Sequence, residues 1–208
     1  FASREFESIK VENLVNIPLG VDLQTFSPNL RNAVVREELL KGEEVLLIHL
    51  GRMSPEKNPQ NSILALIELR NRGINARLIY VGMGPMFAKL KKLAEGQPVT
   101  FLGYIVDRKK LAEIMACADV SIAPGPIETF CLAALESLAS GTPVVASATS
   151  AVGEFLMLDS KNPVGAVAEN KPEAFADAIS QVLELKTSQP DLHQRCHHQA
   201  ENFPWSST

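Results

Sequence analysis

Two glutamates, Glu128 and Glu136, stand eight positions apart just after an apolar run that ends in Pro124-Gly-Pro126. Residues 120–123 have the composition of a buried strand, the prolines stop it, and residues 129–139 have helical spacing. The free N–H groups at a helix start favour an anion, most often a phosphate. Eight positions turn a helix by about two and a quarter turns, so both carboxylates are predicted to face one crevice. Because carboxylates accept hydrogen bonds from sugar hydroxyls, the predicted ligand combines a phosphate with a sugar.

An earlier loop carries two cations, Arg52 and Lys57, between an apolar run at 44–50 and a helix expected to begin at Pro59. At the end of a strand, a planar guanidinium and a mobile ammonium group are predicted to converge on one diphosphate. The alternative is a solvated loop in which Glu56 pairs with one of the cations. These residues alone leave both interpretations open.

A third loop, at 103–110, follows another apolar run and contains Ile105 and Asp107. The backbone of Ile105 and the carboxylate of Asp107 are candidates for contacting a nucleobase, and a carboxylate acceptor matches the N–H donors of guanine. The alternative for Asp107 is an N-cap of the following helix, and both roles can hold together. Gly82-Met-Gly-Pro85 predicts a tight turn that supports the architecture.

Apolar runs that alternate with helical segments predict the fold class. Strands are expected at 44–50, 76–81, 99–102, 119–123, 144–146 and 164–167, with a short one at 14–22, and helices at 29–41, 59–72, 86–94, 111–118, 129–139, 152–158, 172–186 and 189–202. This alternation predicts an α/β fold with a Rossmann-like, doubly wound parallel sheet. Such sheets bind ligands at the carboxyl ends of their strands, where all the loops described above fall.

Composition excludes several classes of protein. With 208 residues, 46 % of them hydrophobic, the chain can bury a core as one domain. A net charge of −4 argues against a nucleic-acid-binding protein that works by phosphate neutralisation. The three cysteines lack paired or metal-ligand spacing, and the sequence shows no signal peptide or long apolar span. A cytoplasmic protein is therefore predicted.

The histidines and two of the cysteines suggest no second functional centre. His193 and His197 are spaced to share a helix face and could bind a metal, but no third ligand is near, so a solvated face is favoured. His49, inside an apolar run, is interpreted as a hydrogen-bonded core or strand-end residue rather than a catalyst. Cys117 and Cys196 are interpreted as packing or surface residues. No metal site is predicted.

Several stretches resemble motifs of one enzyme family. Glu128-Thr-Phe-Cys-Leu-Ala-Ala-Leu-Glu136, followed by Ser140-Gly-Thr-Pro-Val-Val145, resembles the E-x7-E motif of retaining nucleotide-sugar glycosyltransferases of family 4. Gly51-Arg-Met-Ser-Pro-Glu-Lys-Asn58 is similar to the family's G-R-x-x-x-E-K-G/N, and Gly82-Met-Gly-Pro85 to its V-G-x-G-P. Ile17-Pro-Leu-Gly-Val-Asp22 resembles I-P-N-G-V-D. The resemblance covers residues 14–205, with one departure: the family usually has Gly where Cys131 stands.

The resemblance implies roles for these residues within a GT-B fold. Arg52 and Lys57 would stabilise the departing diphosphate without a metal, and Glu128 would hold sugar hydroxyls and stabilise positive character at the anomeric carbon. The residues implied in substrate binding are Gly51, Ile105, Asp107, Lys110, Thr129, Phe130, Cys131, Leu132 and Glu136. Among them, the amides of 130–132 would meet the distal phosphate, and Glu136 the ribose hydroxyls. A positive φ at Cys131 would strain its backbone.

The resemblance also implies a domain organisation. Residues 14–202 look like the nucleotide-sugar-binding C-terminal domain, residues 1–13 like a linker from an N-terminal domain, and residues 203–208 like a segment that crosses back to it. The N-terminal domain would carry the acceptor site and any peripheral membrane association, at the inner face of the membrane. Little or no transfer activity is therefore expected of the chain alone.

The overall match is most like actinobacterial GDP-mannose-dependent α-mannosyltransferases that build mannosylated glycolipids. Ile105, Asp107 and Lys110 are similar to the loop of guanine-using relatives, which favours GDP. A UDP-sugar donor (glucose or N-acetylglucosamine) is the alternative, and no cofactor or nucleic acid is expected.

Two other classes of protein are weighed against the enzyme. An NAD-dependent oxidoreductase shares the doubly wound sheet, but Leu50-Gly-Arg-Met-Ser54 lacks the G-x-G-x-x-G that should follow the first strand. A non-catalytic nucleotide-binding module would leave both glutamates and both cations without a task. Binding of GDP, UDP or NAD distinguishes the three.

Overall fold

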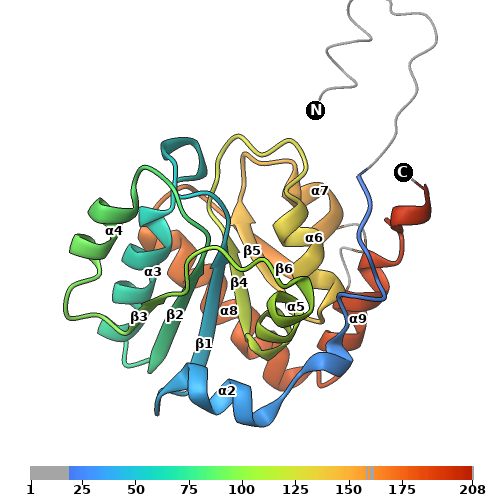
Figure 1. The fold of residues 1–208 in the computed structure, drawn as a ribbon, viewed down its shortest axis with the longest axis horizontal. Helices are drawn as coiled ribbons and strands as arrows, with labels where there is room; N and C mark the ends of the chain where they lie inside the picture. The colour runs from blue at the N-terminus through green and yellow to red at the C-terminus, as the bar shows by residue number, and fades with distance from the viewer. Residues whose placement is uncertain (1–18, 158, 160–161, 208) are drawn as a thin grey trace, which may run out of the picture.

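The computed structural model describes residues 19–157, 159 and 162–207 (Figure 1). In this part of the chain six parallel strands form one sheet in the order β3-β2-β1-β4-β5-β6. Their bounds are β1 (Val45–Leu50), β2 (Ala76–Val81), β3 (Val99–Phe101), β4 (Val120–Ala123), β5 (Val144–Ser147) and β6 (Gly165–Ala168). The order reverses between β1 and β4, and a doubly wound sheet opens a crevice at that switch point. The predicted fold class is confirmed.

Helices cover both faces of the sheet. They are α2 (Ala33–Leu40), α3 (Gln60–Asn71), α4 (Phe87–Leu93), α5 (Arg108–Cys117), α6 (Leu132–Ala139), α7 (Val152–Leu156), α8 (Pro172–Ser188) and α9 (Leu192–Ala200), with 3₁₀ turns η1 (Pro28–Leu30), η2 (Pro55–Lys57) and η3 (Trp205–Ser207). In Figure 1, α5 lies in front of the sheet and α8 behind it. None of the helices in the described residues is long and apolar enough to cross a bilayer.

Neighbouring residues of β1 point into different cores. Leu46 and Ile48 pack in the cluster that includes α5, α6 and α9, whereas Leu47 packs in the cluster with α3 and α8. All three side chains are buried, as expected for a parallel strand covered on both faces. This double coverage explains why the strands appear in the sequence as continuous apolar runs.

Two helix starts differ from the prediction for local reasons. Helix α6 begins at Leu132 rather than at Thr129, because Cys131 takes a left-handed backbone (φ 67°) as its N-cap. Helix α5 begins at Arg108 rather than Leu111, because the Asp107 carboxylate accepts hydrogen bonds from the first-turn amides and stabilises an earlier turn.

The segment near Val21 lies against the C-terminal segment of the described chain. Val21 donates its N–H to the carbonyl of Phe203 (2.9 Å) and accepts from the N–H of Trp205 (3.1 Å). The Phe203 ring in turn lies 6.0 Å from the rings of both Phe130 and Phe155. Val21 thus forms an isolated bridge rather than the predicted strand at 14–22, of which residues 14–18 lie outside the described residues, as does the predicted linker 1–13.

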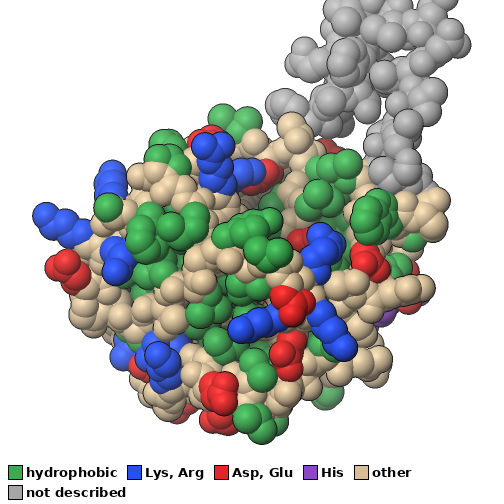
Figure 2. Space-filling model, viewed as in Figure 1, with side chains coloured by type: hydrophobic (Ala, Val, Ile, Leu, Met, Phe, Trp, Pro, Cys, Tyr) green, Lys and Arg blue, Asp and Glu red, His purple; other side chains and the backbone are tan. Residues whose placement is uncertain are grey.

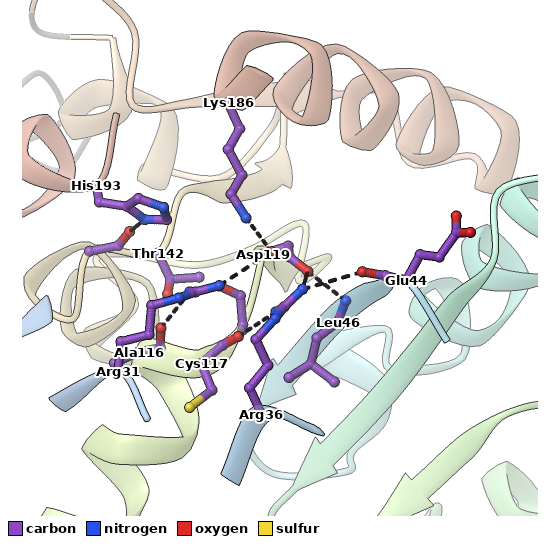
Figure 3. Close-up of polar contacts among 12 residues, drawn as sticks. Arg31, Arg36, Glu44, Leu46, Ala116, Cys117, Asp119, Thr142, Lys186 and His193 are labelled. Atoms are coloured by element: carbon purple, nitrogen blue, oxygen red, sulfur yellow. Dashed lines mark hydrogen bonds and ion pairs between the residues drawn. The ribbon is translucent and has the colours of Figure 1, made fainter. Parts of the chain in front are cut away.

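A buried carboxylate, that of Asp119, lies at the amino ends of strands β1 and β4 (Figure 3). Asp119, 3 % exposed, precedes β4 and accepts from Arg36 Nη2 (2.8 Å) and from the amide of Leu46 (2.7 Å). Its other oxygen pairs with Lys186 from α8, and Arg31 Nη2 lies 3.8 Å away. The two guanidinium groups also donate to carbonyls at the C-terminal end of α5. We call Arg31, Arg36, Asp119 and Lys186 the Asp119 cluster.

The Asp119 cluster holds its central group in the charged form. Burial alone would raise the pKa of Asp119, but Lys186, the Leu46 amide and Arg36 together keep that pKa below its ordinary value. The cluster therefore joins α2 and α8 to the sheet by charge as well as by apolar packing.

Helix α9 docks on the end of α6 through two histidines. The Nδ1 atom of His193 lies 2.8 Å from the carbonyl of Gly141, and that of His197 lies 2.6 Å from the carbonyl of Ala139. Both rings are half-buried, so the predicted solvated face is wrong for this pair. The described residues contain no group of three or more side chains that could hold a metal ion. The spacing of the pair is explained by docking.

Candidate functional site

Two adjoining hollows open at the carboxyl ends of the strands and share Leu50, Gly51 and Ala133. The wide hollow, about 480 Å³, is lined by Gly51, Arg52, Met83, Tyr104, Ile105 and Glu136, among others. The narrow hollow, about 110 Å³, is lined by His49, Gly51, Lys57, Glu128, Cys131 and Leu132, among others. Figure 2 shows hydrophobic side chains gathered on the face where the loop after β3 crosses the sheet, and Tyr104 and Val106 are exposed there.

The wide hollow combines an exposed cation with a shielded carboxylate. Arg52 follows β1, and Glu136 lies in the second turn of α6. The Glu136 side chain is 17 % exposed, and Arg108 Nη2 lies 3.3 Å from its Oε1. Burial raises the pKa of Glu136, an effect that Arg108 partly offsets. A carboxylate in this setting accepts hydrogen bonds strongly, because few waters compete for it.

The narrow hollow contains an ion pair. Lys57 Nζ lies 2.6 Å from Glu128 Oε1, and the Glu128 side chain is 11 % exposed. Gly125 makes room for this carboxylate, because a Cβ atom at Gly125 would lie 2.9 Å from Glu128 Oε1. The pair joins the loop after β1 to the loop after β4.

The prediction that helical rotation brings the two glutamates to one crevice is wrong. Glu128 lies in the loop four residues before α6, so helical rotation does not relate it to Glu136. The two carboxylates line different hollows, which meet at Gly51 and Ala133. The cations are divided in the same way, Arg52 on the wide hollow and Lys57 on the narrow one. A diphosphate that meets both cations would therefore have to span Gly51.

The glycine turn at 82–85 supports the loop that carries the cations. A Cβ atom at Gly82 would lie 2.1 Å from the carbonyl oxygen of Gly51, and one at Gly84 would lie 2.4 Å from that of Met53. The amide of Met53 also donates to the carbonyl of Met83 (3.1 Å). Only glycine permits this close backbone approach, so the turn fixes the position of Gly51.

The helix start at 130–132 offers free donors. Among the described residues, no acceptor is bonded to the amide of Phe130, Cys131 or Leu132. Cys131 and Leu132 line the narrow hollow, whereas the Phe130 ring packs on Phe155 (5.7 Å) and, like the exposed Thr129, lines neither hollow. Phe130 thus holds the loop by packing while its amide remains available to an anion.

Cys131 stores backbone strain at this helix start. Its φ of 67° and ψ of 80° lie in a region that costs a residue with a Cβ atom about 1–2 kcal/mol. Burial, and then the charge of Glu128, raise the pKa of its thiol to about 11. The thiol therefore stays protonated at neutral pH, and Cys131 contributes shape to the narrow hollow rather than a nucleophile.

We expect Cys131→Gly to raise the free energy of unfolding by about 1 kcal/mol, because relief of the strained φ exceeds the added entropy of the unfolded chain. Urea unfolding followed by circular dichroism measures the change as a shift in the midpoint. Ala133→Gly, two residues further in regular helix, is the matched control and should lower stability by about 1 kcal/mol. A Cys131→Gly protein less stable than the wild type would contradict the strain.

The third loop divides between two hollows. Ile105 lines the wide hollow, whereas Asp107 and Lys110 line a neighbouring hollow that shares only Tyr104 and Ile105 with it. The Asp107 carboxylate accepts from the amides of Lys109 (3.0 Å) and Lys110 (3.2 Å), so the N-cap interpretation is confirmed. The structure does not bring Asp107 to the wide hollow, and its contact with a base stays a prediction.

Some residues of the two hollows were missed from the sequence. The sequence does not distinguish Arg108, which lies beside Glu136, from the other cations of the run at 108–110. It predicts Gly125 only as a residue that ends a strand, not as one that makes room for Glu128. The sequence predicts that His49 is a core or strand-end residue without a catalytic role, yet it lines the narrow hollow. The only signal in the sequence was its position as the last residue but one of an apolar strand, two residues before Gly51.

Comparison with known proteins decides the family. The family model described as glycosyl transferases group 1 matches residues 31–203. The chain belongs to this family. The predicted membership in a family of glycosyltransferases is thus confirmed.

Among curated relatives of this group 1 glycosyl transferase chain, a GDP-mannose-dependent alpha-(1-6)-phosphatidylinositol dimannoside mannosyltransferase of Mycobacterium tuberculosis is 47 % identical. The match covers 99 % of this chain and 52 % of the relative. A D-inositol 3-phosphate glycosyltransferase of Mycobacteroides abscessus is 32 % identical over 91 % of this chain and 43 % of its own length. The chain thus spans about half the length of the curated relatives it matches.

Solved structures share the fold of the group 1 glycosyl transferase chain. A sucrose-phosphate synthase from Thermosynechococcus elongatus has a TM-score of 0.76 at 22 % identity, covering 99 % of this chain and 53 % of its own. The C-terminal domain of a group 1 glycosyl transferase from Francisella tularensis has a TM-score of 0.64 at 22 % identity, covering 88 % and 96 %. At these identities the likeness concerns the fold alone.

Proposed function

We propose that residues 14–202 are the nucleotide-sugar-binding domain of a retaining glycosyltransferase that takes mannose from GDP-mannose. The observation that carries the proposal is the meeting of the wide and narrow hollows at Gly51, beside the free amides of 130–132. Along one crevice, this arrangement places first a carboxylate, then N–H groups that can bind an anion, and then a second carboxylate. A nucleoside, a diphosphate and a sugar follow one another in the same order.

Each part of the donor would meet a group suited to it. Glu136 accepts hydrogen bonds from the ribose hydroxyls, and the base lies against Tyr104 and Ile105. The diphosphate crosses Gly51 between Arg52 and the start of α6, where the N–H groups and the helix dipole favour negative charge. The sugar then enters the narrow hollow beside Glu128.

The same groups would lower the barrier to transfer. Negative charge grows on the diphosphate as the glycosidic bond breaks, and Arg52, Lys57 and the amides are already oriented to stabilise it without a metal ion. Positive character grows at the anomeric carbon, where the Glu128 carboxylate is the nearest charge of opposite sign. In this scheme catalysis is charge stabilisation by prearranged groups, with no cofactor.

The acceptor would be bound elsewhere. Because the curated relatives are about twice as long as the match, we propose that the acceptor site and any attachment to the inner face of the membrane belong to an N-terminal domain outside the matched part. Residues 1–13 would link that domain, and 203–208 would cross back to it. In this proposal the protein is cytoplasmic, and its partners are the nucleotide sugar and that domain, with no nucleic acid.

The relatives support a guanine nucleotide, and one observation favours the alternative. The relative with 47 % identity is GDP-mannose-dependent by its name. However, Asp107, the acceptor expected to select guanine, does not line the wide hollow but a neighbouring one that shares Tyr104 and Ile105 with it. A UDP-sugar donor is therefore the second candidate, supported by a pneumococcal O-GlcNAc transferase of the same fold that is solved in complex with UDP and GlcNAc.

Calorimetric titration with GDP, UDP and NAD tests the proposal. We expect GDP to bind at least about tenfold more tightly than UDP, and NAD not to bind. Glu136→Gln should weaken GDP binding by about tenfold, because a charged acceptor of the ribose hydroxyls becomes neutral. Glu37→Gln, on the exposed side of α2, is the control. Binding of NAD alone, or of no nucleotide, would overturn the proposal.

A further inference from the structure

His49 is a buried titratable side chain to which the proposed function gives no role. It lies near the carboxyl end of β1, is 2 % exposed, and lines the narrow hollow together with Lys57 and Glu128. Buried polar groups in proteins almost always have hydrogen-bond partners. The question is therefore what each nitrogen of the imidazole ring bonds to.

One ring nitrogen of His49 bonds to a serine that lies beside a buried tyrosine. His49 Nδ1 lies 2.8 Å from Ser62 Oγ in α3, and the imidazole ring lies 4.7 Å from the ring of Tyr80 in β2. The Tyr80 hydroxyl donates to the carbonyl of Pro59. Burial raises the pKa of Tyr80, and the nearby Ser62 side chain partly offsets that rise.

We infer the tautomer of His49 from the surroundings of Ser62. Because the Tyr80 hydroxyl donates to Pro59, its oxygen keeps lone pairs with which the nearby Ser62 hydroxyl can bond. Ser62 Oγ can then accept from Nδ1–H of His49, which leaves Nε2 with a lone pair. Among the described residues, Nε2 has no hydrogen-bond partner. His49 therefore presents an unpaired acceptor in the wall of the narrow hollow.

The imidazole is neutral in this environment. Burial, and then the nearby Lys57, lower the pKa of His49 to about 3. A neutral acceptor nitrogen repels phosphate oxygens, which are also acceptors, but it suits a hydroxyl group, which donates. With the Glu128 carboxylate beside it, the narrow hollow contains two acceptors that a polyhydroxylated ligand would satisfy.

We propose that His49 is a specificity-determining residue for the donor, whose Nε2 accepts a hydrogen bond from one hydroxyl of the donor sugar. This inference rests on the proposed function and adds a second sugar contact to that of Glu128. It also fixes the orientation of the ligand, with the sugar in the narrow hollow and the nucleoside in the wide one. Ser62 acts as a positioning residue, because it selects the tautomer.

The test compares GDP with GDP-mannose on the same variants by calorimetric titration. His49→Phe keeps the ring packed on Tyr80 but removes both nitrogens, and the double variant His49→Phe with Ser62→Ala leaves no buried hydroxyl unpaired. In both, we expect the affinity for GDP-mannose to fall about tenfold more than that for GDP, which lacks the sugar. Ser62→Ala alone should change the same ratio by about two- to threefold. The exposed His198→Phe is the control.

A change in this ratio separates a sugar contact from damage to the fold, which would weaken both ligands equally. An unchanged ratio in both His49 variants overturns the role of His49 while leaving the proposed function intact. Failure of the wild type to bind GDP would overturn both.

A series of GDP-mannose analogues that each lack one sugar hydroxyl would identify the partner of Nε2. One analogue should bind the wild type about tenfold less tightly than GDP-mannose does. His49→Phe should leave the affinity for that analogue unchanged. If His49→Phe weakens every analogue to the same extent, the proposed hydrogen bond does not exist.

Discussion

Asp119→Asn is expected to lower the free energy of unfolding by about 3 kcal/mol. The substitution keeps an acceptor for the Leu46 amide but removes the charge that Arg36, Lys186 and Arg31 surround. Breaking a buried ion pair by removing one partner costs about 3–5 kcal/mol, and the lower value applies because Arg31 and Lys186 keep part of their surface in water. Urea unfolding gives the difference from the midpoint and slope.

The same substitution should change how stability depends on pH. The folded pKa of Asp119 lies below its unfolded value, so its contribution is complete above the unfolded pKa of about 4 and is lost as the pH falls through the folded pKa. The wild type should therefore lose stability between pH 5 and pH 2 more steeply than Asp119→Asn, and the two curves should converge in acid.

Asp177→Asn is the matched control for the Asp119 cluster. Asp177 also pairs with an arginine, Arg72, but its side chain is 69 % exposed. Surface pairs of this kind contribute about 0–1 kcal/mol, so the control should remain within about 0.5 kcal/mol of the wild type. Equal effects of the two substitutions would show that burial of Asp119 does not matter to the fold.

Lys57→Ala is expected to weaken GDP binding by about 100-fold, which corresponds to about 2.7 kcal/mol. Two effects of the same sign combine. The diphosphate loses a cation, and Glu128, whose side chain is 11 % exposed, is left as an unpaired negative charge at the edge of the phosphate path. Titration calorimetry measures the loss, and Lys171→Ala is the control, because Lys171 forms an exposed pair with Glu169.

The partner substitution should act in the opposite direction on the nucleotide. Glu128→Gln removes the competitor for Lys57, so GDP binding should stay equal or become tighter by a few-fold. In the double variant, Lys57→Ala should then cost less than in the wild type. If Lys57→Ala costs the same with and without Glu128, the ion pair does not govern access of the diphosphate to Lys57.

The fold was predictable because its signals are local. A parallel strand covered on both faces appears as a continuous apolar run, and glycines follow the ends of α2, α3 and α6. The start of α6 was only partly predictable: the glycine that the family has at this position pointed to a possible positive φ at Cys131, but the helical spacing from Thr129 onward hid the start at Leu132. The Asp119 cluster was not predictable, since Asp119 and Arg36 are 83 positions apart in sequence.

The sequence predicts several residues that line the two hollows, among them Arg52, Glu128 and Glu136, but not how they are arranged. Spacing within one loop suggested that Arg52 and Lys57 converge, whereas the η2 turn between them directs the two side chains to different hollows. His49 escaped notice for a related reason. Its role depends on Ser62 and Tyr80, which belong to other elements, and contacts between elements leave no spacing to detect.

The Asp119 cluster and the two hollows lie at opposite ends of the strands of the sheet. The cluster lies where β1 and β4 begin, and the hollows open where those strands end. Substitutions in the loops around the hollows can therefore alter what those loops bind, while the Asp119 cluster, at the other end of the strands, continues to hold the scaffold.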